Sequence, residues 1–183
     1  MTGKDRVKNR PRVIIHTDGG ASPNPGLGGW AAILTAPSAD PLRPRKRREI
    51  YGTERDTTNN RMELTAAIRA LAALKRSCSV DLYTDSTYLR NAFEKSWLEK
   101  WRKNGWKTAS KRPVLNQDLW MELWELTQRH RVRWHWVKGH GTDEANLRCD
   151  QLVQQAKREF LTSPPDVPTS FSNAPLEPSG EEP

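Results

Sequence analysis

Residues 13–20 read Val-Ile-Ile-His-Thr-Asp-Gly-Gly, an apolar and β-prone run that ends on a carboxylate and two glycines. The pattern predicts a buried strand over Val13–Thr17 that brings Asp18 to the edge of a sheet. Gly19 and Gly20 leave room for a backbone or a phosphate to approach that carboxylate. Because a single aspartate at a strand end is usually a turn former, a functional role for Asp18 depends on the residues that join it.

Two further acids are placed by local patterns where they can join Asp18. Asp85 directly follows a predicted strand over residues 80–84, so a second strand ends on a carboxylate. Glu63 lies in a predicted helix that is capped within residues 57–60 and runs to about residue 75. Glu63 also stands three residues after Asn60, the spacing of a capping box, which is the structural alternative to a functional role.

The C-terminal part of the predicted domain supplies a fourth acid. An alternating strand is predicted over residues 131–137, with one wet face or at a sheet edge, and a helix is predicted over residues 143–160. Asn146 and Asp150 are four residues apart on that helix and therefore share one face.

The charge balance favours a polyanionic partner. The chain of 183 residues carries 30 Lys and Arg against 22 Asp and Glu, a formal charge of +8 with a pI of about 9.8. Nucleic acid is the usual partner of such a protein, although a basic protein that is merely soluble remains open on charge alone. Two cysteines suit a reducing compartment, and neither a membrane-length apolar run nor a leader is recognised. We expect a cytoplasmic, soluble protein.

The length fits one domain with two polar ends. Residues 1–11 are predicted to be a flexible basic arm and residues 12–161 the folded domain. Residues 162–183 contain six prolines, four acids and no base, which predicts a disordered tail. Without this tail the remainder has 30 bases against 18 acids, a formal charge of +12.

Strands and helices alternate in a way that indicates an α/β fold. Besides the elements above, strands are predicted over residues 30–35 and 49–53, and helices over residues 86–94 and 116–128. Residues 18–29 form a predicted turn-rich loop, which matches neither a P-loop nor a dinucleotide fingerprint. Residues 36–48 are predicted to be an exposed basic hairpin tip, for which a solvated loop and a phosphate contact are both open.

Cations and aromatic rings coincide in residues 95–112, the basic handle, which has seven bases, one acid and three tryptophans. The combination favours binding along a nucleic-acid backbone, because Lys and Arg displace counterions and flat rings lie against sugars and bases. Tryptophans four residues apart are also ordinary packing residues of a helix. We expect Trp106 to pack in the core, Trp101 to lie at the surface, and Gly105 to end a helix.

A carboxylate cluster would form if the strands that end at Asp18 and Asp85 were neighbours and the helix that carries Glu63 packed across them. Two unit charges about 4 Å apart repel by roughly 4 kcal/mol at an effective dielectric constant of about 20, so such a cluster requires a cation. Oxygen ligands without Cys or paired His indicate Mg²⁺ or Mn²⁺ rather than zinc. Two such ions would suit in-line attack at phosphorus.

Several motifs resemble bacterial ribonuclease HI, in order and over about residues 12–160. They are Thr-Asp-Gly-Gly (17–20), Thr-Thr-Asn-Asn-Arg-Met-Glu-Leu (57–64), Thr-Asp-Ser (84–86), Trp-Arg-Lys-Asn-Gly-Trp-Lys-Thr-Ala (101–109), Asp-Leu-Trp (118–120), Val-Lys-Gly-His (137–140) and Arg-Cys-Asp (148–150). The resemblance implies a ribonuclease H-like fold, a mixed five-stranded sheet flanked by helices. It also implies an endonuclease that hydrolyses the RNA strand of RNA–DNA hybrids with two Mg²⁺ ions, or Mn²⁺ as a substitute, and leaves 3′-hydroxyl and 5′-phosphate ends.

The resemblance also implies roles for particular residues, and we expect a monomer without membrane contact. The metal ligands would be Asp18, Glu63, Asp85 and Asp150, and His140 would assist proton transfer or product release. Predicted substrate contacts are Asn24, Asn59, Asn60 and Thr87 at the minor groove, Thr58 and Asn116 at a DNA phosphate, Trp101 at the DNA strand, and Gly19, Gly20 and Lys103.

Two rival interpretations belong to other classes. A hybrid-binding module without catalysis would have a broken carboxylate set, whereas all four acids are present. Another nuclease of the same superfamily, such as an integrase or a 3′–5′ exonuclease, would share the acids. The Asn-Asn-Arg-Met-Glu-Leu helix start and the basic handle argue against that second interpretation.

Overall fold

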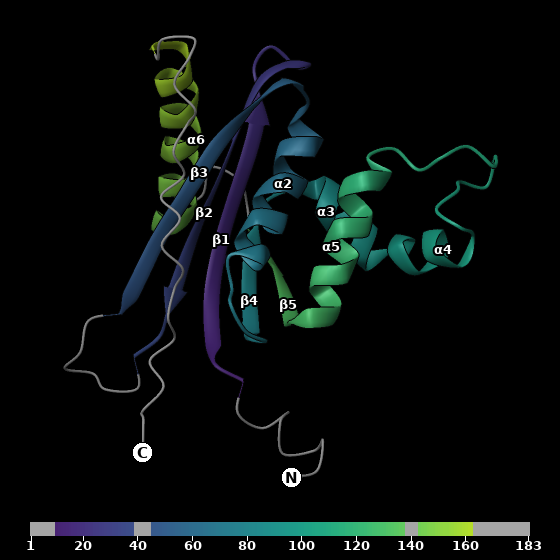
Figure 1. The fold of residues 1–183 in the computed structure, drawn as a ribbon, viewed down its shortest axis with the longest axis horizontal. Helices are drawn as coiled ribbons and strands as arrows, with labels where there is room; N and C mark the ends of the chain where they lie inside the picture. Colours follow the sequence, from purple (N-terminus) through teal and green to yellow (C-terminus); the bar gives the residue numbers. More distant parts are fainter. Residues whose placement is uncertain (1–9, 39–44, 138–142, 163–183) are drawn as a thin grey trace.

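A five-stranded sheet in the order β3-β2-β1-β4-β5 forms the centre of the computed structural model, which describes residues 10–38, 45–137 and 143–162 (Figure 1). The strands are β1 Arg12–Ala21, β2 Gly26–Ala36, β3 Lys46–Thr57, β4 Ser79–Thr84 and β5 Arg131–Trp136. The first three strands pair antiparallel, whereas β4 runs parallel to β1 and β5 parallel to β4. The predicted α/β class with a mixed five-stranded sheet is therefore confirmed, with the alternating strand β5 at an edge.

Helices cover both faces of this sheet (Figure 1). In the numbering of Figure 1 they are α2 Asn59–Ala72, α3 Thr87–Glu94, α4 Trp97–Lys103, α5 Gln117–Arg129 and α6 Glu144–Thr162. The larger core lies between the sheet and α2, α3 and α5, while α6 packs on the opposite face against β1, β2 and β3. None of the helices among the described residues is long and apolar enough to span a membrane.

The buried stripe predicted for α2 is confirmed, but the start of this helix differs from the prediction. Its core-facing residues Ala66, Ala67, Ala70 and Leu71 are fully buried, and Leu74, which was predicted in the helix but lies two residues beyond its end, is 3% exposed. The N-cap is Thr58, whose side chain accepts a hydrogen bond from the Arg61 amide at 3.3 Å. Arg61 thus occupies the third helical position, and the capping-box interpretation of Glu63 is wrong.

The glycine-rich segment predicted as a loop is mostly strand. Asp18 pairs with Ala31, Gly19 with Trp30 and Gly20 with Gly29, so Asp18 lies inside β1 and does not follow it. The antiparallel ladder satisfies the backbone groups of these residues, and this outweighs the low strand propensity of glycine. The connection between β1 and β2 shortens to residues 22–25.

The predicted basic hairpin tip is also shorter than expected. Lys46, Arg47 and Arg48 belong to β3, where they pair with Ala36, Thr35 and Leu34 of β2. Arg47 forms an ion pair with Glu49 at 2.8 Å. Residues 39–44 lie outside the described residues, so the prediction for the tip itself is not addressed, as is also true for the arm over residues 1–9 and the tail over residues 163–183.

Gly19 permits an unusually close approach between α2 and β1. A Cβ atom at this position would lie 2.4 Å from the Met62 carbonyl carbon and 2.6 Å from the Glu63 amide nitrogen, inside van der Waals contact with backbone. A Cβ atom at the neighbouring Gly20 would lie 3.7 Å from the side chain of Asn59, an ordinary contact. Gly19 is therefore the residue that lets α2 lie directly on β1.

Asp81 joins three strands through a buried carboxylate. Its side chain is 2% exposed and lies 2.9 Å from Arg12 Nε of β1, 2.8 Å from Arg133 Nε and 2.9 Å from His135 Nε2 of β5. Burial opposes ionisation of this carboxyl, but the hydrogen bonds from His135, Arg133 and Arg12 outweigh it and lower its pKa from 3.8 to about 2. The ionised form of Asp81 therefore stabilises the folded state.

We predict that Gly19→Ala lowers the free energy of unfolding by about 2 kcal/mol or more, because the new methyl group must displace the α2 backbone. Gly20→Ala is the matched control and should cost much less. Chemical denaturation of both variants measures the difference, and equal losses would show that α2 is not pressed against β1 at Gly19.

A second prediction concerns acid stability. Because the folded-state pKa of Asp81 is depressed, its stabilisation is present above about pH 4 and is lost as the pH falls towards 2. Asp81→Asn should cost roughly 2 kcal/mol at pH 7 and much less near pH 2. Unfolding free energies measured across this range test the expectation. Glu125→Gln, at an exposed position on α5, is the control and should show no such pH-dependent loss.

Candidate active site

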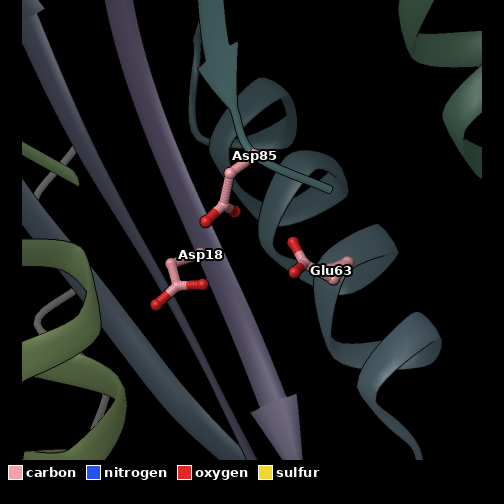
Figure 2. A group of neighbouring side chains, drawn as sticks. All are labelled: Asp18, Glu63 and Asp85. Atoms are coloured by element: carbon pink, nitrogen blue, oxygen red, sulfur yellow. The ribbon is translucent and has the colours of Figure 1, made fainter. Parts of the chain in front are cut away.

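Three carboxylates from different elements point toward one another (Figure 2). Asp18 comes from β1, Glu63 from α2, and Asp85 from the residue after β4. One carboxylate oxygen of each lies within 4.8 Å of the others. The structure thus brings together three of the four acids predicted as metal ligands.

The register of the parallel strands β1 and β4 places Asp18 and Asp85 beside each other. Pairing of β1 with β4 ends at His16 and Tyr83, and each aspartate stands two residues further along its own strand direction. Beyond Asp85 the chain turns into α3, where the Ser86 hydroxyl accepts a hydrogen bond from the Leu89 amide at 3.3 Å. The parallel ladder on one side and this cap on the other fix the backbone around Asp85.

Glu63 is half-buried, like the other two members of the cluster. Its Oε2 atom is buried and has no hydrogen-bond partner. Burial, followed by the charges of Asp18 and Asp85, raises the pKa of Glu63 well above its ordinary value of 4.5. A buried carboxylate oxygen without a donor is costly, and a bound cation would remove both the repulsion and the missing contact. The oxygen-only donor set fits a hard divalent ion such as Mg²⁺.

Asp150 lies on α6 and is outside the group of three. It is exposed, and its neighbour Cys149 is buried with its thiol donating to the His16 carbonyl at 3.4 Å. Burial, followed by the charge of Asp18, raises the pKa of the Cys149 thiol. The contact of this thiol with the His16 carbonyl places this turn of α6 against β1, two residues before Asp18. Asn146, one turn earlier, is buried and its Oδ1 has no partner. The predicted His140 lies in residues 138–142, outside the described residues.

Two predicted substrate contacts, Asn24 and Asn59, hold the end of the β1–β2 hairpin against the start of α2. Asn24 Oδ1 accepts from the Asn59 amide at 3.2 Å, and Asn59 Oδ1 accepts from the Ala21 amide at 2.7 Å. Asn59, Asn60 and Thr87 are exposed, so their surfaces are open to a ligand. These residues line the same end of the sheet as Asp18.

Thr58 and Asn116 are connected through Arg61, a residue that the sequence interpretation did not single out. Arg61 is held by Asp118 at 2.9 Å and lies 3.4 Å from Asn116 Oδ1. The hydrogen bond from Arg61 lowers the pKa of Asp118. Asn116 has a left-handed backbone with φ of 57° and donates to the Tyr88 hydroxyl at 3.2 Å. The sequence feature that could have identified this group of contacts is the cationic residue Arg61, three positions after the cap Thr58.

The basic handle contains one short helix, α4, and a long connection to α5 (Figure 1). Trp106 packs against the core, as predicted. Trp101 is half-buried and not merely at the surface, because its ring lies 5.7 Å from that of Trp97 and 5.6 Å from that of the buried Trp120. Lys103 is exposed, and Gly105 ends α4 with a φ of 64°, as predicted. The handle is thus a packed arm with cations on its outside.

Comparisons with known proteins agree with this geometry. The model of the RNase H family matches residues 10–158. A ribonuclease H of Francisella tularensis subsp. novicida is 51% identical over 154 residues, 84% of this chain and 96% of the relative. A ribonuclease H of Chlorobaculum parvum is 54% identical over 147 residues, 80% of this chain and 96% of the relative.

Solved structures show the same fold. LC9-RNase H1, described as a type 1 RNase H with the type 2 active-site motif, superposes with a TM-score of 0.75 and 27% identity, covering 94% of this chain and 79% of the other. LC11-RNase H1 in complex with RNA/DNA hybrid gives a TM-score of 0.60 and 25% identity, covering 82% of this chain and 99% of the other. The family match spans most of the chain, and the three acids of its motifs converge in space. This chain therefore belongs to the ribonuclease H family and is a metal-dependent nuclease.

Proposed function

We propose that this protein cleaves the RNA strand of RNA–DNA hybrids internally and leaves 3′-hydroxyl and 5′-phosphate ends. The observation that carries the proposal is the convergence of Asp18, Glu63 and Asp85, with a buried Glu63 oxygen that lacks a donor. Membership of the ribonuclease H family supports it, as does the similar LC11-RNase H1, which was solved with RNA/DNA hybrid.

The three clustered acids would hold divalent ions, with Asp150 of α6 as a further ligand. Two Mg²⁺ ions, or Mn²⁺ as a substitute, supply the positive charge that favours in-line attack of water at phosphorus and departure of the leaving oxygen. Asp18 lies between the other two elements, since β1 pairs with β4 and packs against α2. Asp18 would therefore be the central metal ligand of the cluster. His140 would carry a proton during turnover or assist product release.

Substrate recognition would use two separate surfaces. Asn24, Asn59, Asn60 and Thr87, with Gly19 and Gly20, would meet the minor groove, where 2′-hydroxyls and groove shape distinguish a hybrid from duplex DNA. Thr58 and Asn116, positioned by Arg61, would take a phosphate of the DNA strand. Lys103 and the exposed part of Trp101 would follow that strand along the handle. We further propose that the enzyme acts in the cytoplasm as a monomer.

The direct test of this function is a cleavage assay. End-labelled RNA–DNA hybrid, duplex RNA and duplex DNA are incubated with the protein, each with and without Mg²⁺. We expect internal cuts in the RNA of the hybrid only, and only with the metal. Products released one nucleotide at a time would favour an exonuclease, and efficient cleavage in excess chelator would overturn the metal-dependent mechanism.

Asp18→Asn separates charge from shape at the cluster. Asparagine keeps an acceptor oxygen for the Gly19 amide, which donates to Asp18 Oδ1 at 2.9 Å, but removes one negative charge from the cluster. Without metal the variant should be as stable as the parent or more stable, by about 1 kcal/mol. Mg²⁺ should stabilise the parent by mass action and the variant much less, and cleavage should fall by orders of magnitude.

Thermal melts with and without Mg²⁺, together with the hybrid assay, measure these effects. Asp56→Asn is the matched control, because Asp56 is exposed and its φ of 51° suits asparagine equally well. The control should keep both the Mg²⁺ response and the cleavage rate. Near-parent cleavage by Asp18→Asn would mean that Asp18 only shapes β1, and would refute its assignment as a metal ligand.

A further inference from the structure

One face of β4 and β5 is left uncovered by the described residues. Helix α6 packs on β1, β2 and β3 but makes no extensive contact with β4 or β5 within the described chain (Figure 1). The remaining helices lie on the other side of the sheet, where Val132, Trp134 and Trp136 join the larger core. Arg131 and Arg133, which alternate with these core residues, are exposed. The open face thus begins at the sheet edge and comprises β5 and β4, up to the part of β1 that α6 covers.

The register of the three parallel strands orders this face into rows. The successive rows across β1, β4 and β5 are Arg12–Ser79–Arg131, Ile14–Asp81–Arg133 and His16–Tyr83–His135. Among the residues of these rows the one carboxylate is Asp81, which is 2% exposed and neutralised by its three partners. At the β1 end of the third row, His16 Nε2 lies 3.7 Å from the carboxylate of Asp143, just before α6. Over β4 and β5 the face therefore presents cationic and aromatic groups to solvent.

The third row is a continuous stack of rings. The Tyr83 ring lies 4.7 Å from that of His16 and 4.5 Å from that of His135, with interplanar angles of 15° and 12°. His135, at the edge strand, is 38% exposed and ends the row. A flat base placed against its outer side would extend the stack.

The first row adjoins a larger basic surface at the start of the parallel strands. The Cys78 thiol donates to the Arg76 carbonyl at 3.2 Å and the Ser77 hydroxyl donates to the Arg129 carbonyl at 2.7 Å, so both arginines lie at the beginning of β4. Arg10 precedes Pro11, whose carbonyl accepts from the Ser79 amide at 2.9 Å. Arg129 donates to the Lys75 carbonyl at 2.8 Å, so Lys75 belongs to the same surface. Arg76 and Arg131 are exposed and make no ion pair with any carboxylate of the described residues. This surface stands at the opposite end of the sheet from the carboxylate cluster.

The three rows follow one another along the parallel strands, from the basic surface at one end to the candidate active site at the other. Asp18 and Asp85 are the next same-face positions after His16 and Tyr83. Six residues separate Arg12 from Asp18, which is about 20 Å along an extended strand. The basic handle lies on the other side of the sheet, so this path is distinct from the predicted contacts of the hybrid (Figure 1).

We infer that the open β4–β5 face binds a single-stranded extension of the nucleic-acid substrate, running from the carboxylate cluster toward Arg76 and Arg131. An open sheet with rings and arginines is the chemistry by which proteins hold single strands, through stacking and phosphate contacts. The stacked rings of His16, Tyr83 and His135 offer a stacking contact to the bases of a nucleic acid, a contact that an acidic peptide would not use. The inference rests on the proposed function, since the strand must enter from the active site.

The experiment compares two ligands and three proteins in chelator, where no cleavage occurs. The ligands are a blunt hybrid and the same hybrid with a single-stranded extension of about ten nucleotides, a site size that single-strand binding folds commonly use. The proteins are the parent, the double variant Arg76→Gln/Arg131→Gln, and the control Arg55→Gln/Arg158→Gln, which removes two exposed cations from β3 and α6. Fluorescence anisotropy gives the affinities at several salt concentrations, and thermal melts check folding.

We expect the parent to bind the extended hybrid several-fold more tightly than the blunt one. The Arg76→Gln/Arg131→Gln variant should lose most of this advantage and keep the affinity for the blunt hybrid. Its log–log salt slope for the extended hybrid should fall by about 1.4, at about 0.7 for each lost single-strand phosphate contact. The control should behave as the parent.

The inference would be overturned if the extension does not raise the affinity of the parent for the hybrid. It would also be overturned if the double variant keeps the parent's preference for the extended hybrid. A synthetic peptide of residues 163–183, which is acidic, is a competing ligand. Tighter binding of this peptide than of a single-stranded oligonucleotide of equal length would assign the face to an acidic segment and also overturn it. The parent is also tested for cleavage of the blunt hybrid with Mg²⁺. If it cleaves, the proposed function stands even where the inference about the β4–β5 face fails.

Discussion

Repulsion among Asp18, Glu63 and Asp85 is the constraint on which the arrangement of the molecule depends. Each close pair of ionised carboxylates costs several kcal/mol in a partly buried setting, so none of the three would approach the others spontaneously. They are held together by neutral interactions: the β1–β4 ladder, the packing of α2 on β1, and the cap of α3. The apolar core thus provides the rigidity that keeps a cation-binding geometry before any cation is bound.

Much of this could be predicted from the sequence because the signals are local. Strand β4 and helix α3 follow directly from an apolar run and a capping serine, and β5 from strict alternation. Asp18 and Asp85 could be paired from the sequence only on the condition that their strands are neighbours, and the pairing of β1 with β4 meets this condition. Glu63 required the further assumption that its helix crosses these strands, and the contact at Gly19 shows how closely it does.

The sequence predictions fail where the structure is decided by residues far away in the chain, or where several residues could each cap the same helix. The glycines after Asp18 were predicted as loop because their local chemistry favours turns, whereas pairing with β2 makes them strand. Four consecutive residues able to cap α2 left its start ambiguous, and Thr58 is the cap. The Asp81 cluster gave no signal at all, since its partners Arg12 and Arg133 stand 69 and 52 residues away in the chain.

The parallel register of β1 and β4 has a consequence for insertions and deletions. Side chains alternate between the faces of a strand, so one residue gained or lost between Val13 and Asp18 would turn the carboxylate to the opposite face and away from Asp85. A change of two residues would restore the face but shift Asp18 along the strand by nearly 7 Å. Length variation in this protein should therefore be tolerated in the β2–β3 connection and excluded from the first six residues of β1.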